Sequence, residues 1–176
     1  MIRGAAGLAL VPALLFSGGE TAWAGTGTST LTARARVNSN CTIAAQAVRF
    51  GSYDPIGSNR SAALNATGSI TVTCTRGISP TIGLGPGSNA AGDTRRMSSG
   101  ADFLVYELYK PPGNAPGVPC TFPGAAVWRN AGADVLLTTT TTDKNPRTYN
   151  VCGSVPAGQN PAVGTYADTV VATVIF

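Results

Sequence analysis

The sequence has 176 residues, of which 43% are hydrophobic, only 11% are charged and none is His. Its 22 Gly and 12 Pro, together with strand-forming Thr and Val, indicate short strands joined by turns and argue against a helical bundle or a disordered chain. The lack of His removes the commonest general base and metal ligand, and a net charge of +4 without a Lys/Arg run does not favour nucleic-acid binding.

The first 24 residues have the pattern of an export signal. Arg3 precedes an apolar stretch at 5–16, and Ala22-Trp23-Ala24 is an Ala-x-Ala cleavage site. The apolar stretch is too short to span a bilayer, and no longer one follows. We therefore predict a signal peptide over 1–24, a secreted mature chain that begins at Gly25, and no membrane span after the signal is removed.

Four cysteines follow the signal, at Cys41, Cys74, Cys120 and Cys152. In an oxidising compartment an even number predicts two disulfides, for which three connectivities are possible. We favour Cys41–Cys74 and Cys120–Cys152, because each pair brackets one strand-turn-strand stretch. The cysteines are widely spaced and the chain has no His, so we expect no metal site and no cofactor.

Strand patterns follow one another along the rest of the chain. The segment 28–37 alternates cleanly, with Leu31, Ala33, Ala35 and Val37 on one face. In 103–109, Leu104, Tyr106 and Leu108 share a face. Further strands are predicted at 41–50, 68–75, 81–84, 126–129, 135–142, 147–155 and 164–176. Short strands with frequent turn signals predict an antiparallel sandwich or barrel.

No group of residues forms a recognisable catalytic motif. The acids after the signal are scattered, mostly in or beside turns, and Ser/His/Asp chemistry is excluded in its usual form by the missing His. We therefore predict that the chain is not an enzyme. Arg95 and Arg96 are interpreted as a solvated pair in a loop. Trp128 is interpreted as a core residue, with a sugar-binding platform as the alternative.

Several segments gain significance from their order. They are Leu31 to Val37 followed by Cys41-Thr42-Ile43, then Phe50-Gly51-Ser52-Tyr53-Asp54-Pro55, Gly68 to Thr75, Tyr106-Glu107-Leu108-Tyr109, Pro156-Ala157-Gly158-Gln159 and Gly164-x-Tyr166-x-Asp168. In this order, and with the four cysteines, the chain resembles the spore coat protein U-type domain family, which includes the subunits of archaic chaperone–usher pili. The resemblance covers nearly all of 28–176.

The resemblance implies an all-β, immunoglobulin-like antiparallel β-sandwich that lacks its seventh strand. It would consist of an N-terminal donor-strand extension at 25–38 and a pilin domain at 39–176. A periplasmic chaperone would fill the resulting groove with its own strand. At the outer-membrane usher, the extension of another copy or of a related pilin would replace that strand.

The resemblance also assigns residues and a function. Leu31, Ala33, Ala35 and Val37 would be the donor-strand residues, and Val170, Ala172, Val174 and Phe176 would form one wall of the groove. The protein would be a structural subunit of a bacterial surface fibre, exported through the periplasm to a cell-surface pilus (fimbrium), where it supports adhesion and biofilm formation.

Two alternatives remain open from the residues. The alternation at 28–37 suits strand addition to a neighbour, but it equally suits a first strand that completes the chain's own domain. For the whole protein, the alternative function is a monomeric secreted β-sandwich that binds carbohydrate or another surface ligand.

Overall fold

The computed structural model describes residues 19, 24–122 and 124–176, so the predicted signal peptide lies almost entirely outside the described residues. The chain divides into two units, Met1–Arg36 and Val37–Phe176. Every named strand lies in the second unit. No helix in the described part of the chain is long and apolar enough to cross a membrane.

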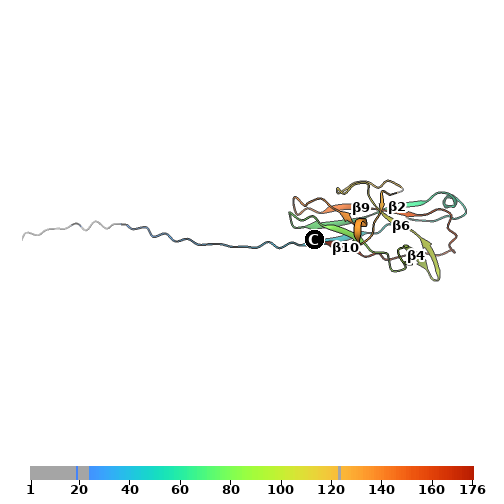
Figure 1. Cartoon of the computed structure of the whole chain (residues 1–176), viewed down its shortest axis with the longest axis horizontal. Helices are drawn as coiled ribbons and strands as arrows, with labels where there is room; N and C mark the ends of the chain where they lie inside the picture. Colours follow the sequence, from blue (N-terminus) through green and yellow to red (C-terminus); the bar gives the residue numbers. More distant parts are fainter. Residues whose placement is uncertain (1–18, 20–23, 123) are drawn as a thin grey trace, which may run out of the picture. The chain divides into compact units, whose positions relative to one another are not determined.

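The second unit is built from antiparallel strands, which confirms the predicted all-β class (Figure 1). A five-stranded sheet has the order β1-β2-β9-β6-β7, a three-stranded sheet has the order β10-β3-β8, and β4 and β5 form a hairpin. The strands are β1 (Cys41–Gln46), β2 (Leu64–Cys74), β3 (Thr81–Leu84), β4 (Arg96–Ser99), β5 (Asp102–Val105), β6 (Glu107–Lys110), β7 (Ala126–Val127), β8 (Leu136–Leu137), β9 (Arg147–Val155) and β10 (Ala172–Ile175). Two short 3-10 helices are η1 (Ser58–Arg60) and η2 (Gly132–Asp134).

The core lies between the two larger sheets because every second residue of the long strands is apolar. In β2 the alternation buries Ile70 and Val72, and in β9 it buries Tyr149, Val151 and Val155. Ile82, Leu84 and Leu136 of the three-stranded sheet belong to the same cluster. The two apolar faces exclude water from one another, which makes this cluster the main source of stability in the fold.

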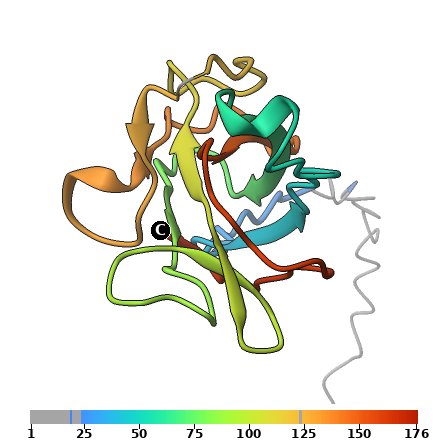
Figure 2. The ribbon, with the colours of Figure 1, turned by 90° about the vertical axis from the view of Figure 1, so that its right-hand side faces the viewer.

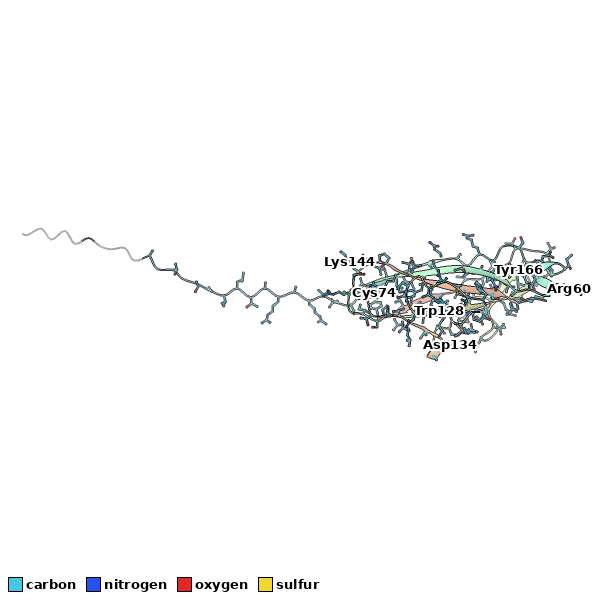
Figure 3. All side chains as sticks on the ribbon, turned by 90° about the horizontal axis from the view of Figure 1, so that it is seen from above. Arg60, Cys74, Trp128, Asp134, Lys144 and Tyr166 are labelled. Carbon is cyan, nitrogen blue, oxygen red and sulfur yellow. A yellow bond between two sulfur atoms is a disulfide. The ribbon has the colours of Figure 1, made fainter. Side chains whose placement is uncertain are left out.

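Trp128 is a core residue, as interpreted from the sequence. Its side chain is fully buried, and its indole N–H donates a hydrogen bond of 2.9 Å to the carbonyl of Ile82. Figure 3 shows it in the interior of the domain. A buried ring cannot stack on a sugar, so the platform alternative is wrong for this residue.

Two disulfides join Cys41 to Cys74 and Cys120 to Cys152, the pairing favoured from the sequence. Cys41 and Cys74 are directly opposed partners in the ladder between β1 and β2. The bridge therefore fixes the start of β1, which is an edge strand with only one neighbour.

The structure differs from the predicted strands in several places. The stretch 103–109 forms two strands, β5 and β6, separated at Tyr106. Leu104, Tyr106 and Leu108, which the alternation placed on one face, are all buried. Only Ala172–Ile175 of the predicted strand 164–176 is a strand, and β4 was not predicted at all. Residues 28–37 are exposed and form no strand.

Arg95 is also placed differently from the prediction. The interpretation as a solvated residue is wrong, because the side chain is 0% exposed. Its guanidinium donates hydrogen bonds to the carbonyls of Leu84 (3.0 Å), Gly85 (2.7 and 3.1 Å) and Trp128 (2.7 Å), and it pairs with Glu107. A cation is tolerated in the core because carbonyls and a carboxylate replace its water.

Candidate strand-acceptor groove

Two adjoining cavities open between residues 45–53 and residues 161–172, and we call them together the groove. Their volumes are about 490 and about 590 Å³. Val48, Phe50, Met97 and Tyr166 line both cavities. Figure 2 shows the C-terminal segment, in red, crossing this side of the domain. The lining of the first cavity is largely apolar, which is unusual for a surface that water can reach, whereas polar and apolar surface are about equal in the second.

The floor of the groove belongs to the core. Ile70, Leu84, Leu108 and Val151 reach it from both larger sheets. Ala45 of β1 also lines the groove, and its direct partner in the ladder is Ile70, so both side chains lie on the core face of the sheet. Ile70 is buried whereas Ala45 is exposed. The groove is therefore a part of the core that no described residue of this domain covers.

Both walls of the groove carry unpaired backbone. Within the described residues, the N–H and C=O groups of 47–50, and those of Asp168 and Val170, have no hydrogen-bond partner. The carbonyls of Ala167, Thr169 and Val171 are instead bound on the opposite side, by Ser98, by Ser88 and by Gly85. Alternate residues of an extended chain point their polar groups to opposite sides, so 168 and 170 present theirs to the groove.

An apolar floor between two unpaired backbone edges is the requirement for adding a strand. The incoming chain would hydrogen-bond to one or both edges and place every second side chain on the floor.

Two glycines let one wall cross the inner face of the sheet. A Cβ on Gly68 would lie 2.7 Å from Cγ2 of Val48, and one on Gly153 would lie 2.7 Å from Cζ of Phe50. Residues 46–50 thus leave the edge of the sheet and pack over these glycines, and Phe50 makes an edge contact with Tyr106 at 6.0 Å between centroids.

The four residues predicted as a groove wall are not all in the groove. Val170 and Ala172 line it. Val174 packs against the core further along β10, and Phe176 is 51% exposed and lines neither cavity. The structure thus places two of the four in the groove, and a role of Val174 and Phe176 in strand binding stays a prediction.

Sequence reasoning missed most of the other lining residues, among them Val48, Phe50, Met97, Tyr106 and Tyr166. Val48 and Phe50 had a usable signal, since they alternate at the end of the predicted strand 41–50. Met97 had none, because its neighbours suggested a loop.

The predicted donor residues are available to a partner. Leu31 is 96% exposed and Val37 is 82% exposed, and Ala33 and Ala35 are exposed as well. Figure 1 draws residues 24–36 as one extended stretch. An extended segment with alternate apolar side chains in water has the form of a strand without a sheet.

A buried ionic network lies behind the groove. Glu107 pairs with Arg95 and, through both carboxylate oxygens, with Arg129 at 2.7 and 2.6 Å. Burial acts to raise the pKa of Glu107, but hydrogen bonds from Arg129, from the N–H of Leu108 and from Arg95 outweigh it and hold that pKa below its ordinary value. Burial lowers the pKa of Arg95, which the ion pair with Glu107 opposes.

The network is connected to the groove wall through one glycine. Arg95 binds the carbonyl of Gly85, and the N–H of Gly85 donates to the carbonyl of Val171 at 2.8 Å. The wall segment is therefore attached to the most buried polar group of the domain.

Comparison with known proteins agrees with this geometry. The family model for the Spore Coat Protein U domain matches residues 27–173. The chain belongs to the Spore Coat Protein U domain family. Protein U of Myxococcus xanthus is 35% identical over an alignment of 173 positions, which covers 87% of this chain and 87% of Protein U. Membership of this family indicates a structural, non-enzymatic protein.

A solved structure shares the fold. The complex of the CsuC chaperone with the CsuE tip adhesion subunit, from archaic chaperone–usher Csu pili of Acinetobacter baumannii, contains a chain that is 26% identical with a TM-score of 0.54. The match covers 80% of this chain and 40% of that chain, so the present domain spans less than half of its neighbour. The fold is the immunoglobulin-like antiparallel sandwich expected from the sequence.

Proposed function

We propose that this chain is a subunit of a surface fibre of the archaic chaperone–usher type, and that it polymerises by donor-strand exchange. Residues 28–37 of one copy would enter the groove of the next, with Leu31, Ala33, Ala35 and Val37 on the floor. The observation that carries the proposal is the groove itself, an exposed part of the core between two unpaired backbone edges.

Two further observations support it. The segment that would donate the strand is exposed and alternates in the required way. The related Csu complex pairs a subunit with a chaperone, which is the kind of partner that an incomplete sandwich requires before assembly. We infer that a periplasmic chaperone occupies the groove first, that an outer-membrane usher is the site of exchange, and that other copies or related subunits follow.

The same proposal gives the location. A subunit with a signal peptide at 1–24 leaves through the periplasm and ends in a cell-surface pilus, where adhesion and biofilm formation are the expected roles. Its two disulfides suit an oxidising compartment. The carbohydrate-binding alternative loses its best candidate residue, since Trp128 is buried.

The test uses two neighbouring positions on opposite faces of the donor segment. Ala33→Asp places a carboxylate on the floor of the neighbour's groove, whereas Thr32→Asp places the same charge on the outward face. Electrophoresis in SDS without heating, together with electron microscopy, measures polymer length. We expect ladders and fibres from Thr32→Asp and only single subunits from Ala33→Asp. Equal polymers from the two variants would refute donor-strand exchange through this segment.

A further inference from the structure

We propose that the motif Gly164-x-Tyr166-x-Asp168 is a clamp that holds one wall of the groove open before any strand arrives. This inference rests on the proposed function and adds a role for residues that the groove lining alone does not explain. The wall segment, 164–171, precedes β10 and forms no regular strand of its own. Hydrogen bonds with Tyr106, with Asn89 and with Ser98 hold it in place.

Asp168 makes the central anchor. Its Oδ2 accepts a hydrogen bond of 2.7 Å from the hydroxyl of Tyr106, and its Oδ1 accepts bonds from the backbone N–H of Asn89 (3.0 Å) and from the side-chain amide of Asn89 (3.1 Å). Gly87, at a φ of +95°, lies so close that a Cβ there would overlap the carboxylate. The loop 87–89 is thus shaped to receive this one side chain.

The other two motif residues fix the segment at its far end. The hydroxyl of Tyr166 donates to the carbonyl of Ala162 at 2.9 Å, while its ring lines both cavities. Gly164 lies against Ser99 of the β4–β5 hairpin, where a Cβ would overlap the serine hydroxyl. Figure 3 shows Tyr166 and Arg60 at the opposite end of the domain from Cys74.

Backbone bonds complete the clamp between these points. The N–H and C=O of Ala167 exchange hydrogen bonds of 3.1 and 2.9 Å with Ser98. The amide of Asn89 also donates to the carbonyl of Ala167 at 3.2 Å. All of these partners lie in the loop 87–89 or in the hairpin, outside the groove.

The clamp opposes a definite force. An apolar groove in water gains free energy if its walls close, because apolar surface is then removed from water. Hydrogen bonds to a carboxylate are stronger than those between neutral groups, and they are lost if the wall moves inward. A preformed groove spares the incoming strand the cost of reopening it.

The clamp therefore acts on the free subunit more than on the filled one. Once a strand is seated, its own backbone bonds to Asp168 and Val170 hold the wall. Loss of the clamp should slow association of the strand and leave its dissociation almost unchanged. A general loss of stability would not produce this pattern.

The experiment uses the full chain with Ala33→Asp, so that it cannot donate to itself, and a labelled synthetic peptide of residues 25–38 as the probe. Stopped-flow fluorescence gives both rate constants. Asp168→Ala and Tyr106→Phe should each lower the association rate constant by about tenfold, the equivalent of one hydrogen bond of about 1.4 kcal/mol, with dissociation changed by less than about twofold. Asp168→Asn, which keeps an acceptor for Asn89, should restore most of the rate.

Asp143→Ala is the matched control. It also removes a carboxylate that accepts a backbone N–H and pairs with an arginine, Arg147 at 3.0 Å, but it lies outside the groove. Its rate constants should equal those of the parent, which is the full chain with Ala33→Asp alone. Tyr106→Phe keeps the buried ring, so it remains informative if Asp168→Ala fails to fold.

The outcomes separate the clamp from the proposed function. Normal association in Tyr106→Phe and in any folded Asp168 variant would overturn the clamp, and so would an effect on dissociation alone. Failure of the peptide to bind the parent itself would overturn donor-strand exchange, and the clamp with it.

Discussion

Ile43 of β1 lies directly opposite Val72 of β2 on the core side of the sheet, yet Ile43 is 37% exposed and Val72 only 1%. Paired residues on one face normally share their burial, because the same layer covers them. The difference shows that the layer over β2 stops before it reaches β1. A strand that lies over the core face of β1, at the edge of the opposite layer, would continue that layer.

The first prediction concerns protection of the groove walls in the polymer. The backbone amides of residues 47–50, of Asp168 and of Val170 have no hydrogen-bond partner among the described residues, so they should exchange quickly with solvent and become protected when a strand is seated. Hydrogen–deuterium exchange with mass spectrometry can compare the Ala33→Asp subunit with assembled wild-type fibres. Unchanged exchange of both walls on assembly would contradict a strand in this groove.

A second prediction concerns the glycine over which one wall crosses. Gly68→Ala would bring its Cβ within 2.8 Å of the carbonyl of Gln46 and 3.0 Å of the N–H of Val48, so the backbone must move. We expect a loss of about 1–3 kcal/mol in the free energy of unfolding, measured by urea denaturation.

Gly113→Ala is the control for this change, because its Cβ would meet nothing closer than Val118 at 3.5 Å. Its stability should match that of the wild type or exceed it slightly. If the two alanine variants were equally stable, the close packing of 46–50 on the sheet would be wrong.

The third prediction concerns Glu107 and pH. Because the pKa of Glu107 is held below its ordinary value of 4.5, its ionised form stabilises the fold at and above that pH, and this contribution disappears as the pH falls through the lowered pKa. Glu107→Gln should therefore cost about 3 kcal/mol at pH 7, where it leaves Arg95 buried without its anion. The difference between wild type and variant should shrink below about pH 4.5.

Urea denaturation at pH 7, 5 and 3.5 measures this difference. Asp143→Asn serves as the comparison, since it removes a carboxylate in an exposed ion pair. A cost for Glu107→Gln that stayed constant over the whole range would show that the charge of Glu107 does not contribute.

The sequence predicted some features of this fold well and others not at all, for identifiable reasons. Alternation in 103–109 correctly placed Leu104, Tyr106 and Leu108 on one face, because side-chain period depends only on local backbone geometry. It could not reveal that the chain changes sheets at Tyr106, since sheet membership is decided by partners distant in sequence, such as Ser154 opposite Glu107.

Arg95, behind the groove, is a second residue whose partners are too distant in sequence to be predicted. Two adjacent arginines beside turn residues look like a solvated loop, and the carbonyls that bind Arg95 include those of Leu84 in β3 and of Trp128, the residue that follows β7. Only the folded chain brings them together. Likewise the alternation at 164–176 suggested one strand, but its first half binds loop 85–89 and makes a single bridge to Ser98 of β4 instead of a continuous ladder.

The fourth prediction concerns the disulfides. Both close loops of similar length, with sequence separations of 33 and 32, so the chain-entropy model gives each about 4 kcal/mol. The double replacements Cys41→Ser with Cys74→Ser, and Cys120→Ser with Cys152→Ser, should lose similar stability in urea denaturation. Only the first should also slow binding of the 25–38 peptide, because its bridge fixes β1 beside the groove.

Peptide binding slowed equally by both pairs of replacements would mean that β1 has no special part in the acceptor site. Under reducing conditions the wild-type chain, if it remains folded, should lose as much stability as the two pairs of replacements lose together. It should also bind the peptide more slowly, as the Cys41→Ser with Cys74→Ser variant does.

The most direct test of the central claim mixes two defective subunits. The Ala33→Asp subunit keeps an intact groove but cannot donate its strand. The Val170→Asp subunit keeps an intact donor strand but cannot accept one in its groove. Val171→Asp, on the exposed side of the same segment, is the control for Val170→Asp. Each defective subunit alone should remain single, and Val171→Asp should polymerise. Native mass spectrometry of the mixture should find a one-to-one heterodimer and nothing longer. No heterodimer from two folded subunits, or long polymers from the mixture, would contradict head-to-tail strand exchange.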